Sequence, residues 1–326
     1  MADNYTNTLA GLLMLNDANM ADIYPSNVLD RAPVMAQALA VPASQGGTLH
    51  KYLRRKTAAG AGFRAIARGI TNAAEQFEDI SVVAELLDGS FDRDVALALG
   101  YRGGIEAYLQ KETLAALKTM FFRLEEATFN LSVASAFKGL PYMADYWAKD
   151  LDQVVDAGGS GGKSVWLLRW AEDGVAVVAG NEGRINFTLP TDDQIVRITD
   201  SDSRPFSAYR TTLLGFYALQ VGSKYDVARI CNLDGTSGKT LTDDMLYNAV
   251  SRFEASRQPN MIVMNRTALK ELREARTGTN PTGTPAPRPT DLEGIPIVTT
   301  DTLTNSEAEV TNTGETSPTS VTTSTT

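Results

Sequence analysis

The sequence has one cysteine, Cys231, and one histidine, His50, among its 326 residues. A lone cysteine cannot form an intrachain disulfide, so we expect a fold without disulfides, suited to a reducing compartment. One histidine and one cysteine also cannot supply a histidine-based triad, an HExxH site or a Cys/His zinc cluster. The spacing of the acidic residues singles out no catalytic pair. We therefore expect no histidine- or cysteine-based catalytic or metal site, whereas carboxylate chemistry stays possible in principle.

Long apolar runs and an excess of basic charge are also absent. No stretch approaches about 18 consecutive apolar residues, and the first residues carry an acid where an export signal would carry basic residues. We expect neither an export signal nor a membrane span. The 30 basic and 39 acidic residues give a net charge of −9, which argues against nucleic-acid binding over the whole surface. The length suggests about two domains.

The dominant pattern that is present predicts a long amphipathic helix over residues 103–137. Its apolar side chains recur with the three- to four-residue period of one helix face. They are Ile105, Leu109, Ala116, Met120, Leu124, Ala127 and Leu131. At ~1.5 Å per residue such a helix would reach roughly 45 Å, which is longer than a compact domain of this size normally needs. We therefore expect an extended element to lie along it.

Charge is distributed unevenly before this helix. No acid occurs between Asp30 and Glu75, and acids then predominate up to Asp94. Predicted strands at 48–56 and 80–87 flank a glycine-rich stretch, so a basic limb runs outward and an acidic limb returns. Such excursions are uncommon inside a compact domain. Two interpretations stay open: a solvated charged face, or pairing with another subunit, which gives register more than affinity.

Residues 157–164, AGGSGGKS, match a relaxed phosphate-loop pattern, with Lys163 and Ser164 at the lysine and magnesium-ligand positions. A phosphate loop must open a helix, whereas residues 165–170 alternate as a strand. Asp173-Gly174 then predicts a tight turn before a second strand at 175–178, and Ala157 replaces the first glycine. We favour a glycine linker that enters a hairpin, and a nucleotide-binding enzyme remains the alternative.

The ends of the chain have a different character. Residues 1–45 contain short apolar patches broken by Pro25, Pro33 and Pro42, so we expect an arm that lies on another surface. Residues 209–233 predict two long strands broken near Gly222-Ser223. From Thr304 onward, 13 of 23 residues are Ser or Thr and none is basic, a composition that predicts disorder.

Four segments together resemble the major capsid proteins of tailed bacteriophages, and those of short-tailed epsilon-fifteen-like phages most of all. In order they are SVWLLRWAEDGVAVVAG, SAYRTTLLGFYALQVGSKYDVARICNLDG, PNMIVMNRTALKELR and RPTDLEGIPIVTTDTL. The resemblance covers roughly residues 160–303. It implies an α+β protein with the Hong Kong 97 capsid fold. The parts expected are an N-terminal arm (1–45), an extended loop (46–99), a peripheral domain with the long spine helix (100–149), an axial domain (150–290), a return strand to the peripheral domain (291–303) and a tail (304–326). Whether the strands at 206–233 belong to the axial or to the peripheral domain stays open.

The resemblance implies a structural protein that forms hexamers and pentamers in an icosahedral shell around double-stranded DNA, without sequence-specific binding or a membrane. It implies a virion location, assembly in the bacterial cytoplasm, and portal and scaffolding proteins as partners, whereas the presence of a decoration protein stays open. It also implies a protein that is not an enzyme, with no substrate, catalytic residue, metal or cofactor. A decoration or tail-tube protein is the other alternative. The expected subunit contacts of the extended loop are Lys51, Arg54, Arg55, Lys56, Arg64, Arg68, Glu75, Glu78 and Asp79. The expected core face of the spine helix is Ile105, Leu109, Met120, Leu124 and Leu131.

Overall fold

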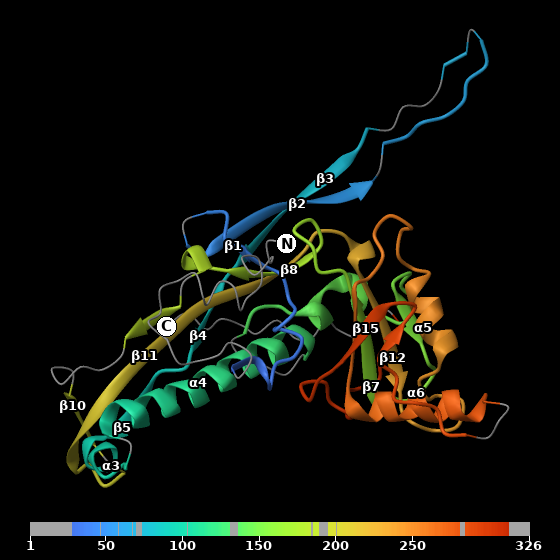
Figure 1. Cartoon of the computed structure of the whole chain (residues 1–326). Helices are drawn as coiled ribbons and strands as arrows, with labels where there is room; N and C mark the ends of the chain where they lie inside the picture. The colour runs from blue at the N-terminus through green and yellow to red at the C-terminus, as the bar shows by residue number, and fades with distance from the viewer. Residues whose placement is uncertain are drawn as a thin grey trace, which may run out of the picture. The chain divides into compact units, whose positions relative to one another are not determined.

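The computed structural model describes residues 28–45, 47–57, 59–66, 68–69, 74–102, 104–130, 136–183, 185–188, 195–199, 201–280 and 284–312. Two compact units are formed, and the chain enters each of them more than once (Figure 1). The first unit comprises Met1–Glu126, Ala134–Phe137 and Ala171–Gly222, and the second comprises Ala127–Val133, Lys138–Trp170 and Ser223–Thr326. The mixture of helices and sheets confirms the expected α+β class.

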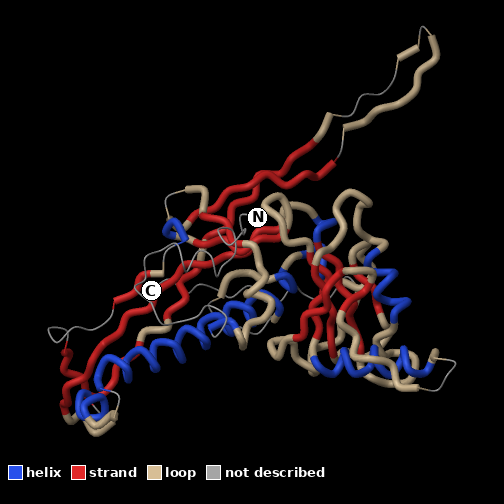
Figure 2. The backbone as a smooth tube through the Cα atoms, viewed as in Figure 1, coloured by secondary structure: helices blue, strands red, loops and turns tan. Residues whose placement is uncertain are grey.

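The first unit is organised around its longest strand. Its elements are β1 (Ala40–Pro42), β2 (Leu49–Thr57), β3 (Gln76–Val83), β4 (Glu85–Asp88), β5 (Phe91–Asp94), α3 (Val95–Leu99), most of α4 (Gly104–Phe129), β8 (Val175–Ala179), β9 (Asn186–Thr188), β10 (Ile195–Thr199) and β11 (Pro205–Val221). Strand β11 is antiparallel to β4, β5, β8, β9 and β10, and β1 pairs in parallel with β8. Strands β2 and β3 form a separate two-stranded sheet that projects from the rest of this unit (Figure 2).

Helix α4 is the long helix that the apolar period predicts, but it ends at Phe129 and not at residue 137. Asn130, a weak helix former, donates from its side-chain amide to the Thr302 carbonyl at 2.7 Å. Residues 136–139 are not helical, and a Cβ on Gly139 would overlap the carbonyl oxygen of Ala127. Tertiary contacts that the local period does not encode therefore end the helix eight residues early.

The segment before β1 is bound to α4. The buried Glu125 carboxylate accepts hydrogen bonds from the backbone N–H groups of Val34 and Met35, at 3.0 and 3.2 Å, and the Arg31 guanidinium lies 5.1 Å from the centre of the Phe122 ring. Residues 28–45 thus belong to the first unit, contrary to the expectation of an arm over 1–45. Their apolar side chains are buried locally, since β1 also joins the main sheet. Residues 1–27 lie outside the described part.

The second unit is a six-stranded sheet with two helices on one face. Its elements are the 3-10 turns η2 (Leu140–Tyr142) and η3 (Ala144–Tyr146), β6 (Val154–Asp156), β7 (Lys163–Leu168), β12 (Val227–Leu233), α5 (Asp243–Val250), β13 (Met261–Met264), α6 (Arg266–Gly278), β14 (Asp291–Leu292) and β15 (Ile295–Thr299). The order is β14-β15-β13-β7-β12-β6. Leu246 of α5 and Leu272 of α6 pack with Val165, Ile230 and Ile262 of the sheet. Thr242 and Asn265 cap the two helices through side-chain oxygens.

Several predicted boundaries are wrong. The predicted 46–99 excursion ends at Val83, because the Ala84 N–H donates to the Thr48 carbonyl and β4 and β5 then pair with β11. Asp173-Gly174 does not join a hairpin: β7 pairs with β12 and β13, whereas β8 pairs with β1 and β11. Each of these strands finds a partner distant in sequence.

The later strands also belong to different units from those expected. The break near Gly222-Ser223 is confirmed, and it divides residues 206–233 between β11 of the first unit and β12 of the second. Residues 171–222 lie in the first unit with most of α4, although an axial domain over 150–290 would include them. Strand β15 pairs in parallel with β13 of the second unit, so residues 291–303 do not return to the unit of the long helix.

Candidate assembly surface

The β2–β3 hairpin carries the predicted contact residues. Lys51 and Arg54 lie in β2, Glu78 and Asp79 lie in β3, and Arg64, Arg68 and Glu75 lie in the segment between them. Arg55 and Lys56 are also in β2, but their side chains are outside the described part. Arg54 is directly opposite Glu78 in the register, and opposite residues of an antiparallel pair project their side chains from the same face. The basic limb therefore has acidic neighbours in its own hairpin, which the sequence hypothesis did not include.

The two faces of this hairpin differ in exposure. His50 is buried, and Tyr52 and Arg54 are half-buried on one face. The register places Leu53, Phe77 and Val83 on the other face, where they are 66%, 54% and 58% exposed. We call these three residues the outer apolar face.

The tip of the hairpin is also apolar and basic. Phe63 and Ile66 are exposed by 110% and 99%, and the Arg64 guanidinium donates to the Arg68 carbonyl at 3.1 Å. Exposed apolar side chains grouped in this way are typical of a surface that another protein covers. Within the part of the chain that the structure describes, both the tip and the outer apolar face are left in water.

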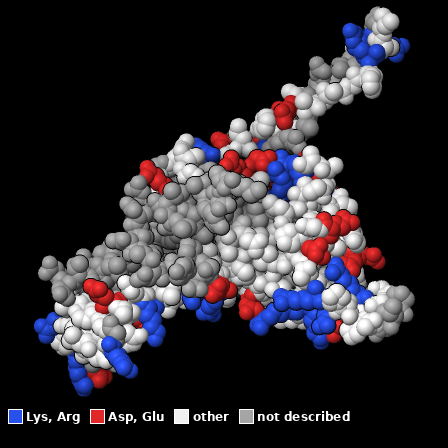
Figure 3. Space-filling view, in the orientation of Figure 1, with Lys and Arg blue, Asp and Glu red and all other residues white. Residues whose placement is uncertain are grey.

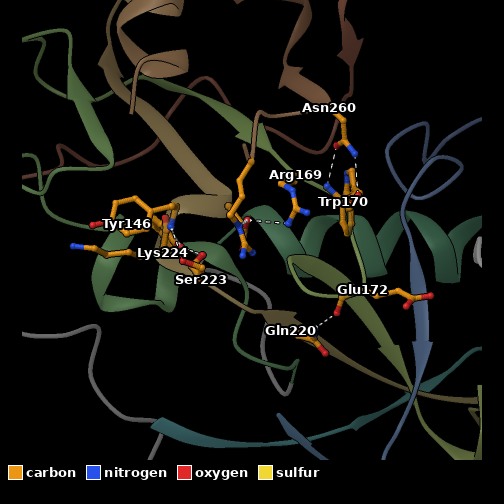
Figure 4. Close-up of polar contacts among 11 residues, drawn as sticks. Tyr146, Arg169, Trp170, Glu172, Gln220, Ser223, Lys224 and Asn260 are labelled. Atoms are coloured by element: carbon orange, nitrogen blue, oxygen red, sulfur yellow. Dashed lines mark hydrogen bonds and ion pairs between the residues drawn. The ribbon is translucent and has the colours of Figure 1, made fainter. Parts of the chain in front are cut away.

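The base of the hairpin is fixed to the main sheet of its unit by His50. Its Nδ1 accepts the Ser44 backbone N–H at 3.2 Å, so Nε2 carries the proton and donates to Gln220 Oε1 at 2.7 Å. The Gln220 amide in turn donates to the Glu172 carbonyl at 2.7 Å (Figure 4). Val221 N–H donates to the Tyr52 hydroxyl at 3.3 Å. The only histidine of the chain thus has a structural role.

Helix α4 buries more than its predicted face. Leu109, Met120 and Leu124 are buried and Ile105 is half-buried, whereas Leu131 is outside the described residues. Leu109 packs with Ala98 of α3 and Tyr209 of β11. The sequence interpretation missed the further buried side chains of this helix, which are Thr113, Leu117, Phe121, Glu125, Thr128 and Phe129. Residues 28–37 cover Glu125, which accepts the backbone N–H groups of Val34 and Met35, and the Phe129 ring centre lies 6.4 Å from that of Trp166 within the second unit.

The glycine-rich segment at 157–164 is not a phosphate loop. Lys163 begins strand β7, and its buried Nζ contacts the buried Glu271 carboxylate on α6. Glu271 Oε2 also accepts the Leu241 N–H at 3.3 Å. A lysine held in this way has no free charge for a phosphate, and the loop opens a strand instead of a helix. Because β7 begins at Lys163, the glycines before it serve as a linker into a strand and not as a nucleotide-binding loop.

The glycines receive the C-terminal segment instead. Gly162 and Glu307 exchange backbone hydrogen bonds at 2.9 and 3.0 Å, and the Glu307 carboxylate accepts from Arg229 Nη2 at 3.0 Å. Asn232 bonds both backbone groups of Val310, at 2.8 and 2.9 Å. Residues 304–312, which we call the strap, are therefore ordered, contrary to the composition of the tail. Their Glu and Val side chains supply contacts that the Ser/Thr count hides.

A second buried carboxylate holds the start of β12. Asp226 is fully buried and bonds Arg257 Nη2 at 2.8 Å and Arg169 Nη1 at 3.2 Å. Burial raises the pKa of Asp226, and the two guanidiniums oppose that rise. Figure 4 shows Arg169 beside Trp170, whose backbone N–H and C=O both pair with the Asn260 side-chain amide. The Tyr146 hydroxyl donates to the Lys224 carbonyl at 3.2 Å. These contacts are structural.

The described His, Cys, Asp and Glu residues form no group of three or more that could hold a metal ion. None of the helices within the described ranges is both long and apolar enough to span a membrane.

This chain is similar to known proteins in both sequence and fold. The family model described as "Major capsid protein GP7" matches residues 18–311. A chain in the structure of bacteriophage Epsilon15 is similar with a TM-score of 0.59 and 19% identity, over 84% of this chain and 88% of that chain. A chain of the bacteriophage JBD30 capsid is similar with a TM-score of 0.51 and 10% identity, over 81% of this chain and 88% of that chain. At these identities the likeness concerns the fold. A search of curated proteins gave no match.

Proposed function

This chain belongs to the GP7 family of major capsid proteins, and from that membership we propose how its subunits join. It is a structural protein of the icosahedral bacteriophage shell, and the predicted resemblance is confirmed by the family and the fold. The finer proposal is that the β2–β3 hairpin lies on a neighbouring copy in the shell. Its outer apolar face and its tip would then become buried between subunits.

One observation carries this proposal: the hairpin exposes apolar side chains that no described residue of its own chain covers. Leu53, Phe77 and Val83 share one face, and Phe63 and Ile66 occupy the tip. Covering a large apolar side chain contributes about 1.5–3 kcal/mol. Repeated around a capsomer, such contacts give the large total interface of a permanent assembly.

Charge sets the register of this contact in our proposal. Lys51, Arg64 and Arg68 are exposed on the outgoing limb and tip, and Glu75, Glu78 and Asp79 are exposed on the returning limb. Exposed pairs add at most about 1 kcal/mol each, so they select the alignment of the hairpin and the apolar residues supply most of the affinity. Arg55 and Lys56 belong to the same proposed set.

Exchanging two opposed charges distinguishes ion pairs within the hairpin from ion pairs with a neighbouring subunit. Arg54→Glu together with Glu78→Arg keeps opposite charges facing each other within the hairpin but reverses what a neighbour meets. We expect this double variant to fold, as judged by circular dichroism, and to form few shells in electron microscopy of the purified protein. Normal shells would show that these two charges act only within the hairpin.

The apolar contact has its own test. Leu53→Ser with Phe77→Ser should leave the monomer folded and greatly lower the yield of shells, because both side chains face water in one chain. The matched control is Leu53→Met with Phe77→Leu, which keeps an apolar side chain at both positions of the same face. Shells from the first variant at the wild-type yield would refute the proposed contact, and persistent monomers of the wild type would refute assembly itself.

The remaining parts of the proposal concern the wider particle. We propose that hexamers and pentamers form in the cytoplasm of the bacterial host with a scaffolding protein and a portal, and that a decoration protein binds the finished shell. The first unit would be the peripheral domain and the second unit the axial domain. The absence of a reaction is inferred from the structural role of the family.

A further inference from the structure

Helix α6 carries basic side chains on its solvent face. Arg266, Lys270 and Arg273 are exposed and spaced i, i+4, i+7, whereas Ala268, Leu269 and Leu272 are buried toward the sheet. We call the three cations the α6 stripe. Figure 3 shows Lys and Arg side chains gathered over this part of the second unit. This is a local concentration of positive charge on a chain with a net charge of −9.

The charges of the α6 stripe are weakly neutralised. Arg266 pairs with Asp301 at 2.7 Å and Lys270 with Glu274 at 3.4 Å, and the side chains of both pairs are 61–79% exposed. Such pairs are weak and exchange readily. Arg273 donates from Nε to the Ala286 carbonyl at 2.8 Å, and no ion pair joins it to an acid among the described residues. Arg288, two residues after Ala286 in the chain, is also exposed.

The neighbouring helix provides a contrast. Helix α5 covers the same face of the sheet but begins with Asp243 and Asp244. Asp243 binds Arg276, the remaining arginine of α6, at 2.7 Å, so that arginine is committed to the α5–α6 contact. Among the described residues of the two helices, the cations left facing water are those of the α6 stripe and not of α5.

The geometry points to a phosphate backbone as the ligand of the α6 stripe, and we propose that it contacts the packaged DNA. At ~1.5 Å per residue the three cations span about 10 Å along the helix, a length over which duplex DNA carries roughly six phosphate charges. A groove of about 430 Å³ opens beside the stripe, and Arg266, Lys270 and Asn305 are among its lining residues. Contacts between these cations and phosphate groups would bind DNA without sequence specificity.

This inference rests on the proposed function, because only a shell wall meets enclosed DNA on one side. It places the helix-bearing face of the second unit toward the interior. Three exposed contacts are few: proteins that make about 6–10 phosphate contacts lose roughly 10³–10⁵ in affinity between 50 and 200 mM salt. The α6 stripe therefore holds DNA against the wall loosely and lets it move during packaging.

The test measures the salt dependence of DNA binding by the unassembled full-length protein. A fluorescent duplex of about 30 base pairs is the probe, titrated at several KCl concentrations. Each phosphate contact contributes about 0.9 to the slope of log Kobs against log [salt], so Arg266→Gln/Lys270→Gln/Arg273→Gln should lower the slope by about 2.7. The control, Lys51→Gln/Arg64→Gln/Arg68→Gln, changes the charge equally on the hairpin. An unchanged slope for the α6 variant, or an equal loss in the control, would overturn the assignment.

Two further readouts keep this test separate from the test of assembly. The α6 variant should still form shells in electron microscopy; failure to form shells with wild-type DNA binding would make the α6 stripe a subunit contact and would overturn the inference. Thr267→Cys adds an exposed thiol beside the stripe in a chain whose own Cys231 is buried. A bulky maleimide should label this thiol in free subunits and not in intact shells. Labelling of intact shells would place the stripe outside and refute the proposed orientation.

Discussion

The buried pair of Lys163 and Glu271 allows a quantitative test of how the second unit is held together. Lys163→Met keeps the length and most of the volume of the side chain but removes its charge. The Glu271 carboxylate, 9% exposed, would then lose its counterion and keep only the hydrogen bond from Leu241. Breaking a buried pair from one side costs about 3–5 kcal/mol, because a charge remains in a poorly solvated site.

The partner change should largely reverse this loss. Glu271→Gln alone leaves the ammonium of Lys163 uncompensated and should destabilise by a similar amount. The double variant has no buried charge, and the glutamine oxygen can still accept the Leu241 N–H. We expect it to be within about 1–2 kcal/mol of the wild type, so the coupling free energy in the double-mutant cycle should be about 3 kcal/mol or more.

Tryptophan fluorescence during urea unfolding measures this effect in the correct unit. All three tryptophans of the chain, Trp147, Trp166 and Trp170, lie in the second unit. With an m-value of about 2 kcal/mol per molar urea, a loss of 3 kcal/mol lowers the midpoint by about 1.5 M. Lys270→Met with Glu274→Gln is the control, since this pair is exposed on the same helix and is worth about 0.5 kcal/mol or less. A double variant as unstable as the single variants would refute the reasoning.

Three further predictions concern other contacts. Gly161→Ala should speed proteolysis within the strap, because Gly161 has a φ of +106° and a Cβ there would lie 2.5 Å from the Glu307 carbonyl oxygen; Gly278→Ala, with nothing within 4 Å, is the control. The hydrogen bond from Arg210 lowers the pKa of Asp92. This pair therefore stabilises the fold at pH values above the ordinary carboxyl pKa, and that stabilisation is lost as the pH falls through the lowered value. Asp92→Asn should therefore show a smaller fall in melting temperature between roughly pH 5 and pH 2; an equal fall would contradict this. His50→Phe should cost about 1–3 kcal/mol in the unfolding free energy of the first unit, measured by circular dichroism, since the buried Gln220 side chain and the Ser44 N–H each lose their hydrogen bond to the imidazole.

Local patterns predicted the elements that depend on neighbouring residues. The apolar period marked α4, with Leu109, Met120 and Leu124 on its buried side. The alternation after the glycines marked β7 and weighed against a phosphate loop. These signals need only a few consecutive residues, because helix and strand periods repeat over short distances.

Local sequence patterns could not predict which distant segments pair with each other. The turn signal at Asp173-Gly174 is genuine, yet β7 and β8 pair in different sheets. The composition of the strap predicts disorder, although its Glu307 carboxylate accepts a hydrogen bond from Arg229. Nothing near position 163 in the sequence indicates Glu271. Which of several suitable strands or charges becomes the partner depends on competition among all of them.

The sequence by itself determined the class of the protein. One cysteine and one histidine argued against disulfide and zinc frameworks, the apolar period determined the long helix, and four ordered segments identified the capsid family. Only the tertiary structure decided where α4 ends, which unit receives β11, β12 and β15, and which side of the hairpin leaves Leu53 and Phe77 exposed. The physical reason is that helix and strand periods are local, whereas sheet partners and buried charges are chosen between residues tens to hundreds of positions apart.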